Sequence, residues 1–208
     1  MEYGTEEQQA EAVKDWWVNN RVPVIAGLVI GIVLMIAWSG YKSWNKTQSE
    51  NNAALYAGIS EEIVAKHGSA YADAEKYISE NKGNVYGALG SLSLASNYVL
   101  DGKYDKAESM LRIAADFSDP ALSSTAKIRL ARVQIQQKKY DEAKKTLDSV
   151  KSPVYQPMAE EVRGDMLVAQ QKLKEAHDAY KKAVELSGDS IEMNPQLSSK
   201  LNDLTIAE

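Results

Sequence analysis

The chain of 208 residues contains no cysteine, only two histidines and a single phenylalanine. Without cysteine it has no disulfide framework, no thiolate nucleophile and no zinc–thiolate site. Two histidines far apart in the sequence do not by themselves supply a set of metal ligands. An excess of positive charge is also lacking, because the net charge is −5 and the isoelectric point is near 5.2, which argues against nucleic acid as a partner. These absences disfavour most classes of enzyme.

Catalytic sequence motifs are missing as well. No GxxxxGK[ST] phosphate loop, GxSxG nucleophile elbow, HExxH zinc motif or EF-hand loop occurs. His67 follows a lysine at a predicted helix end, and His177 lies beside Asp178 on a charged helical face. Both histidines are therefore predicted to be solvated surface residues rather than ligands or bases. We expect a protein that is not an enzyme and that needs no cofactor or metal.

Charge is absent from one long segment. Residues 22–41, VPVIAGLVIGIVLMIAWSGY, form a run of 20 uncharged residues between Arg21 and Lys42. As a helix this run is about 30 Å long, which matches the hydrocarbon thickness of a bilayer. The tryptophans lie near its two ends, as in the aromatic belts of membrane proteins: Trp16, Trp17, Trp38 and Trp44. The pattern predicts one transmembrane helix.

The leader before this segment bears on whether it is cleaved and how it is oriented. Residues 1–21 carry five acidic residues against Lys14 and Arg21, whereas signal peptides begin with a short basic region, so we expect an uncleaved anchor. The basic residues on the two sides give only a marginal preference for a cytoplasmic N-terminus. Within the segment, Gly27 and Gly31 form a GxxxG pair, which is a candidate packing face for another membrane helix.

The rest of the chain has helical periodicity and an internal repeat. Strand signals are poor, since Ala, Glu, Lys and Leu dominate and no Asn-Gly or Asp-Gly turn separates alternating β-branched runs. Small and bulky residues recur with a shift of 36 and then 33 residues: Leu94-Ala95, Ala107 and Leu111; Leu130-Ala131, Ala143 and Leu147; Gly164, Ala176 and Tyr180. This is the tetratricopeptide (TPR) pattern, in which helix pairs stack to bury a shared core.

The repeats predict an all-α fold, in which a single N-terminal transmembrane helix precedes a TPR-like helical-repeat solenoid over residues 42–208. In each repeat the alanine at the start of the second helix allows a close approach, and Tyr98, Leu111, Leu147 and Tyr180 fill the space between helices. Repeats are expected at about 88–120, 124–153 and 157–188, and further helices at 45–66 and 69–81. After Pro195, three leucines at i, i+4 and i+7 predict a capping helix over about 195–205.

The first helices of such an array form a concave surface, which is the expected binding face. The lysine and asparagine clamp with which TPR adaptors hold C-terminal carboxylates is missing. The face is instead mixed apolar and polar, which suits weak contact with unfolded segments or a protein partner. The residues expected there are Leu92, Ser96, Ile128, Arg132, Gln136, Asp165 and Val168.

The whole plan resembles a known family. The segments EAVKDWW, NVYGALGSLSLASNY and IRLARVQIQ, the single anchor and the leucine-spaced tail resemble, essentially end to end, the YfgM-like family of ancillary subunits of the bacterial SecYEG translocon. The resemblance implies a bacterial inner-membrane protein with a cytoplasmic leader (1–21), an anchor (22–41) and a periplasmic TPR-like domain (42–208). It also implies association with the translocon and with a membrane-anchored periplasmic chaperone of the prolyl-isomerase type, and a role in handling unfolded, newly translocated clients.

Two alternatives remain open from the residues alone. One is a membrane-anchored TPR scaffold that faces the cytosol and serves the assembly of another complex, which the near-balanced flanking charges permit. The other is a membrane-bound regulator that acts through its cytoplasmic leader.

Overall fold

The computed structural model describes the backbone of residues 6–188 and 194–205, and the side chains of residues 9–63, 69–188 and 194–204. Over these residues the chain is helical and has no strand, so the predicted all-α class is confirmed. The first five residues of the predicted leader, residues 189–193 and residues 206–208 lie outside the described residues. The chain divides into two compact units, Met1–Asn52 and Ala53–Glu208.

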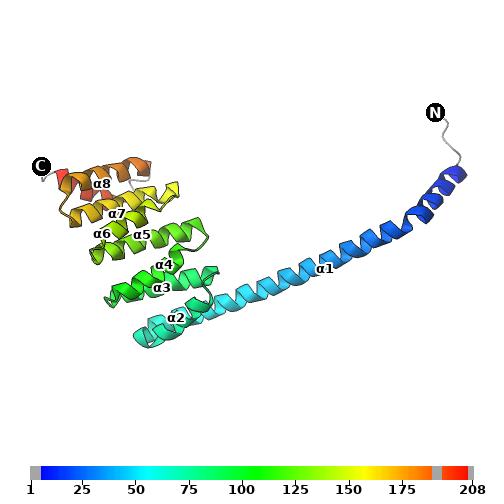
Figure 1. The fold of residues 1–208 in the computed structure, drawn as a ribbon, viewed down its shortest axis with the longest axis horizontal. Helices are drawn as coiled ribbons and strands as arrows, with labels where there is room; N and C mark the ends of the chain where they lie inside the picture. The colour runs from blue at the N-terminus through cyan, green and yellow to red at the C-terminus, as the bar shows by residue number, and fades with distance from the viewer. Residues whose placement is uncertain (1–5, 189–193, 206–208) are drawn as a thin grey trace. The chain divides into compact units, whose positions relative to one another are not determined.

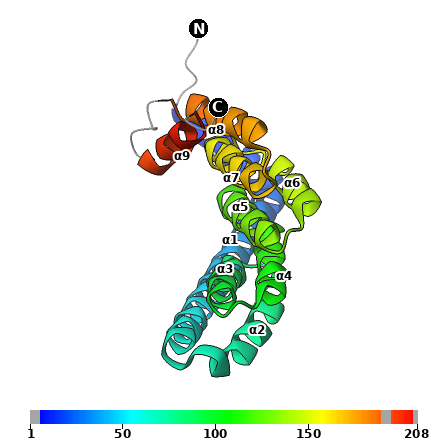
Figure 2. The same ribbon diagram turned by 90° about the vertical axis from the view of Figure 1, so that its left-hand side faces the viewer.

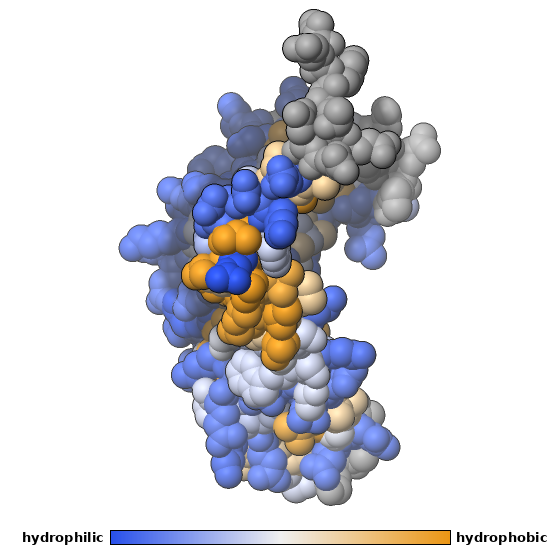
Figure 3. Space-filling view, turned by 90° about the vertical axis from the view of Figure 1, so that its right-hand side faces the viewer, coloured by the Kyte–Doolittle hydropathy of each residue, from blue (hydrophilic) through white to orange (hydrophobic). Residues whose placement is uncertain are grey.

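The first unit is the N-terminal part of one long helix, α1 (Glu6–Lys66), which contains Pro23 and the predicted anchor. Its most apolar stretch has a mean hydropathy of 2.4, and no part of that stretch is buried against the protein. Hydrophobic side chains form a continuous surface along the helix, with hydrophilic residues on either side of it (Figure 3). By length and composition, this helix is able to cross a membrane.

The second unit is a stack of helix pairs (Figure 1). After the short 3-10 helix η1 (His67–Ala70) the chain continues through α2 (Tyr71–Glu80), α3 (Val85–Leu100), α4 (Tyr104–Ala115), α5 (Pro120–Gln136), α6 (Tyr140–Asp148), η2 (Pro153–Tyr155), α7 (Gln156–Ala169), α8 (Leu173–Ser187) and α9 (Pro195–Thr205). The pairs α3–α4, α5–α6 and α7–α8 correspond to the three repeats expected from the sequence.

Capping residues determine where α3 and α5, each the first helix of its pair, begin. The Asn84 side chain accepts a hydrogen bond from the Gly87 amide at 2.9 Å, so α3 begins at Val85 rather than at 88. Asp119 caps α5 by accepting two backbone amides, and Pro120 is the first residue of that helix rather than the end of the preceding repeat.

The turn inside each helix pair has the same geometry. It contains one residue in the left-handed region: Gly102 (φ 72°), Lys138 (φ 62°) and Gln171 (φ 62°). The amide of the lysine that follows then donates to the carbonyl five residues earlier, from Lys103 to Tyr98 (2.8 Å), from Lys139 to Gln134 (2.8 Å) and from Lys172 to Leu167 (2.9 Å). Each first helix therefore ends in a Schellman-type cap, although only one of the three turns has a glycine at the left-handed position.

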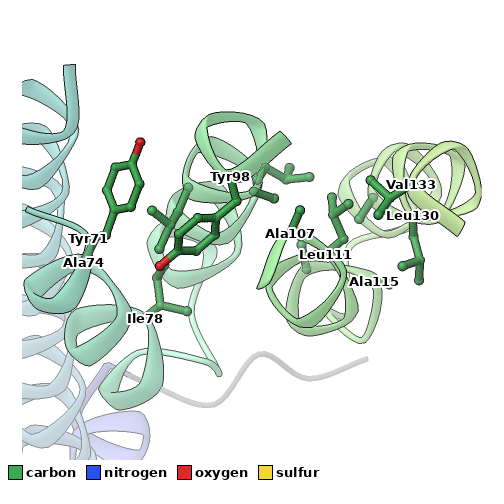
Figure 4. Close-up of a cluster of buried hydrophobic side chains, with 14 of the residues drawn as sticks. Tyr71, Ala74, Ile78, Tyr98, Ala107, Leu111, Ala115, Leu130 and Val133 are labelled. Atoms are coloured by element: carbon green, nitrogen blue, oxygen red, sulfur yellow. The ribbon is translucent and has the colours of Figure 1, made fainter. Parts of the chain in front are cut away.

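The core lies between the paired helices and has the predicted composition. Ala107, Ala143 and Ala176 are completely buried. Tyr98, Leu111, Leu147 and Tyr180 are buried as well, which confirms that bulky residues fill the space around small ones. Figure 4 shows Tyr98 and Leu111 in their cluster, with Ala107 beside Leu111. At Gly164 the approach is closer still, because an added Cβ would overlap the ring of Tyr180.

Flanking helices complete the two ends of the stack. At one end, Tyr71 of α2 packs edge-on against the ring of Tyr98, with 4.9 Å between the ring centroids, and Ile63 from the end of α1 joins the same cluster. At the other end, Leu197 of α9 is buried against Tyr180 and Ala183 of α8. These contacts give the outer repeats a partner for their apolar faces.

Candidate functional site: a groove between α3 and α5

The first helices of the pairs, α3, α5 and α7, lie along one side of the stack, and α4 and α6 lie along the other (Figure 2). A groove of about 430 Å³ lies between α3 and α5, with α4 contributing to its base. Its lining comes from three helices: Leu92, Ala95, Ser96 and Val99 of α3; Tyr104 and Leu111 of α4; Arg129, Arg132, Val133 and Gln136 of α5. The groove is thus apolar at its base and polar along the α5 wall.

Helical periodicity places these side chains together. On α5, Arg129, Arg132 and Gln136 stand at i, i+3 and i+7, which is one face of the helix. On the opposite face of α5, Leu130 and Ala131 are buried in the core of the stack. The same division holds along α3, so each helix contributes one stripe to the core and another to the groove.

The two arginines of the groove differ from arginines elsewhere in the stack. In the described part of the chain, no carboxylate lies within ion-pair distance of Arg129 or Arg132, and both side chains are exposed. Arg112, in contrast, bonds to Glu108 and to Glu142 at 3.0 Å. The groove therefore carries two guanidinium groups whose donors are available to a ligand.

Four of the seven residues that the sequence places on the binding face line this groove: Leu92, Ser96, Arg132 and Gln136. Leu92 is largely buried and forms part of the base, whereas the other three are exposed. Ile128, also expected on the concave face, is buried in the core at 1% exposure. Arg129 was not identified from the sequence, although its position three residues before Arg132 on the same helical face is the signal that predicts it.

The remaining two predicted residues lie on α7, away from the groove. Val168 is 38% exposed. The Asp165 carboxylate accepts a hydrogen bond from the Tyr180 hydroxyl at 2.8 Å and another from the Lys200 ammonium group at 2.7 Å. The Asp165 carboxylate is thus bonded within the protein. It is therefore not a free binding group on the third repeat.

The C-terminal helix supplies the partner of that acidic face. Lys200 of α9 lies 2.8 Å from a carboxylate oxygen of Glu161 as well as 2.7 Å from one of Asp165. Burial acts to lower the pKa of Lys200, but its hydrogen bonds with Asp165 and Glu161 outweigh this effect and raise the pKa above its usual value. Lys200 therefore connects α9 to α7 as a stable cation.

Ion pairs also connect successive repeats on the side of the second helices. Glu108 of α4 accepts hydrogen bonds from Arg112 on its own helix and from Lys139, which immediately precedes α6 in the next pair, the latter at 2.9 Å. Burial acts to raise the pKa of Glu108, but the bonds from Lys139 and Arg112 prevail, so the pKa lies below its usual range. These contacts fix one pair against the next and leave the groove side free.

His177 and the two anchor glycines were the other positions singled out in the sequence. Nδ1 of His177 lies 3.6 Å from the carboxylate of Asp178, and among the described residues no group of His, Asp and Glu is placed to hold a metal ion. In α1, a Cβ added at Gly27 or Gly31 would meet no atom within 4 Å. That helical face is thus open to a neighbour in a membrane.

Comparison with known proteins gives a consistent result. A family model described as a tetratricopeptide repeat-like domain matches residues 14–206. A protein of Escherichia coli K12 called "Ancillary SecYEG translocon subunit" is 31% identical over 205 residues, which is 98% of each chain. Proteins with the same name are similar in Buchnera aphidicola of Schizaphis graminum (34% identity over 72% of this chain and 76% of that protein) and in Neisseria gonorrhoeae (27%, over 96% and 97%). No solved structure matches.

Proposed function

The chain belongs to the YfgM-like family of ancillary SecYEG translocon subunits, and from this premise we propose that it is an accessory subunit that helps to handle newly translocated proteins beside the translocon. The observation that carries the proposal is the similarity along almost the entire chain, which includes the anchor helix and the TPR-like domain together. The chain is not an enzyme, since its relatives are named as translocon subunits with a scaffold type of domain.

The proposed topology follows from the first unit. Residues 1–21 form a cytoplasmic leader, residues 22–41 cross the inner membrane, and residues 42–208 form the periplasmic domain. The exposed apolar surface of α1 supports a membrane location, because such a surface is costly in water. The slight excess of basic residues before the segment, together with the family, supports the orientation.

The proposed partners contact two surfaces. The translocon and a membrane-anchored periplasmic chaperone of the prolyl-isomerase type meet either the groove, through Leu92, Ser96, Arg132 and Gln136, or the membrane helix, through Gly27 and Gly31. Val168 and Asp165 extend this surface along α7 only at its edge, since Asp165 is already bonded to Lys200. Unfolded client segments use the groove, whose mixed lining tolerates varied sequences.

Site-specific photo-crosslinking in native membranes tests these contacts. A photoreactive residue at Ser96, Arg132 or Gln136 is expected to capture a translocon subunit or the chaperone, and the same probe at Lys145, which is exposed on α6, is expected to capture much less. Replacement of residues 22–41 by an unrelated anchor distinguishes binding through the groove from binding through the membrane helix. If capture from the groove positions disappears in that chimera, the membrane helix is the main binding surface.

Protease accessibility tests the topology and the alternatives. In spheroplasts with an intact inner membrane, added protease is expected to digest the domain from Lys42 onward. Protection of the domain would contradict the proposal and favour a scaffold that faces the cytosol. Deletion of residues 1–14 is expected to leave partner capture unchanged, and loss of capture would favour a regulator that acts through its leader.

A further inference from the structure

We propose that the groove between α3 and α5 binds an apolar peptide segment that carries carboxylates, which Arg129 and Arg132 hold against the groove wall. The inference rests on the proposed function, in which this groove contacts protein, and it specifies the chemistry of the bound segment. Nothing in the family match assigns a ligand to either arginine.

The two guanidinium groups of the groove are close together and have no carboxylate partner among the described residues. Arg129 and Arg132 stand one turn apart on one face of α5, where side chains at i and i+3 are about 5–6 Å apart at Cβ. Within the described residues neither has a carboxylate partner, whereas Arg163 has both Asp148 at 2.7 Å and Glu160 at 3.1 Å. A guanidinium group presents a planar fork of donors that matches a carboxylate, so an anionic oxygen pair is the complementary ligand.

An apolar base lies beside these charges. Leu92, Tyr104 and Leu111 line the groove below the arginines, and Val99 remains 37% exposed at its wall. A free anion would leave this apolar surface in water, whereas a peptide with apolar and acidic side chains covers both parts. Ser96 and Gln136 are exposed at the walls and can bond the polar backbone of such a peptide.

At the C-terminal end of the stack the protein makes a contact of the same kind with its own last helix. Asp165 of α7 stands 33 residues after Arg132, at the corresponding position of the next repeat, and Lys200 of α9 reaches it at 2.7 Å. There the amphipathic helix α9 packs through Leu197 against Tyr180 and Ala183 of α8, and through Lys200 it bonds to carboxylates of α7, so apolar and charged contacts act together. At the α3–α5 groove the fixed charge has the opposite sign, so the matching segment is acidic.

The experiment measures peptide binding to the full chain in nanodiscs of zwitterionic lipid. The probes are three fluorescent ten-residue peptides of leucine and serine that carry glutamate, glutamine or lysine at the same three positions. We expect the glutamate peptide to bind about ten-fold more tightly than the glutamine peptide, because hydrogen bonds to charged groups contribute more than neutral ones. The lysine peptide is expected to bind more weakly than either, and added salt is expected to reduce the preference.

Variants assign the preference to the groove. Arg129→Gln with Arg132→Gln is expected to reduce the preference for glutamate to less than about two-fold, since the fork donors are lost. Lys174→Gln with Lys181→Gln, on exposed positions of α8, removes the same charge and should keep the preference. Ser96→Glu adds a carboxylate on the opposite wall and is expected to weaken the glutamate peptide selectively. The thermal unfolding midpoint of each variant serves as the check that it is folded.

Several results would overturn the inference. Equal binding of the glutamate and glutamine peptides to the unmodified chain would do so, as would an unchanged preference in the double arginine variant or an equal loss in the lysine control. Displacement of the peptide by phosphatidylglycerol vesicles as readily as by unlabelled peptide would assign the arginines to lipid instead. If the preference is absent but groove positions still crosslink to the translocon, the inference fails and the proposed function stands. If the preference is present without such crosslinks, the inference stands and the translocon proposal fails.

Discussion

The two units of the protein use similar apolar residues in opposite surroundings. In the first unit, Leu34 and Ile36 of α1 are 64% and 67% exposed, and the apolar residues cover all sides of the helix. In the second unit, Leu94 is completely buried, and the apolar residues of each helix are confined to the face that meets its neighbours. The difference lies in where each unit finds its apolar contacts: the stack supplies its own, whereas the apolar surface of α1 has the length and composition that a bilayer covers.

The surroundings of the glycines also differ between the two units. Gly27 and Gly31 in the anchor have open space where a side chain would extend, whereas Gly164 in α7 is in contact with the ring of Tyr180. A small residue in the stack is therefore required by a neighbour that the structure contains. A small residue in the anchor is required only if a second membrane helix lies there.

The largest expected effect comes from placing charge in the first unit. Val29→Arg with Ile32→Arg should abolish stable membrane integration, because each arginine near the bilayer centre costs about 2.5–3.5 kcal/mol. Extraction of membranes with alkaline carbonate measures this, and the double variant is expected in the soluble fraction. Ala54→Arg with Leu55→Arg changes exposed positions of the same helix beyond the anchor and should remain integrated. If the Val29→Arg with Ile32→Arg variant is integrated as well as the parent protein, residues 22–41 are not the part of α1 that spans the membrane.

The next effect is confined to the second unit. Gly164→Val is expected to lower the free energy of unfolding of the repeat domain by about 3 kcal/mol, because the new side chain overlaps the ring of Tyr180. Pulse proteolysis of the full chain in detergent at increasing urea concentration measures the change, and Gly27→Val serves as the control without effect. Tyr180→Leu in the Gly164→Val background should cost less than the sum of the two single changes. Full additivity would show that the contact is not the cause.

A smaller effect concerns the turns of the stack. Lys138→Gly should raise the free energy of unfolding by about 1 kcal/mol, because a side chain is disfavoured in the left-handed conformation that this residue adopts. Gly102→Ala should lower it by a similar amount for the same reason. Lys145→Gly, within α6, is the matched control and should lower it by about 1 kcal/mol. The same urea assay checks all three variants. A loss of stability in Lys138→Gly would contradict the conclusion that this turn has the same left-handed geometry as the turn at Gly102.

The smallest effect is the acid dependence of the contacts between repeats. The depressed pKa of Glu108 means that its contribution to stability is present above the usual pKa of a glutamate and is lost as the pH falls through the lower folded value. Between about pH 5 and pH 3 the repeat domain should lose stability, and Glu108→Gln should make this loss shallower. Thermal unfolding at a series of pH values checks the slope, with Glu175→Gln at an exposed position of α8 as the control. An identical slope in the Glu108→Gln variant would assign the acid sensitivity to other groups.

Much of the fold follows from local sequence patterns. Ala107, Ala143 and Ala176 identified the helix contacts because a small residue recurs wherever two helices of a pair touch. The helix boundaries were less accurate, since the start of α3 depends on a capping bond from Asn84 and that of α5 on one from Asp119. The groove was predicted in part, since Ser96, Arg132 and Gln136 line it whereas Ile128 is buried. Helical spacing identifies the side of a helix that faces the groove, but a residue at the border of that side can turn into the core instead.

The sequence by itself determined the anchor-length apolar helix, the helical repeats and the family, because each depends on residue order and spacing along the chain. Only the tertiary structure decided which charged side chains are available for binding. Arg112 and Arg129 do not differ in kind as sequence letters, yet Arg112 bonds to a carboxylate 30 residues away while Arg129 faces the groove. In the same way, Asp165 was expected on an open face and is bonded to Lys200, which lies 35 residues further along the chain. Such pairing depends on how distant helices pack against one another, and short-range periodicity carries no information about it.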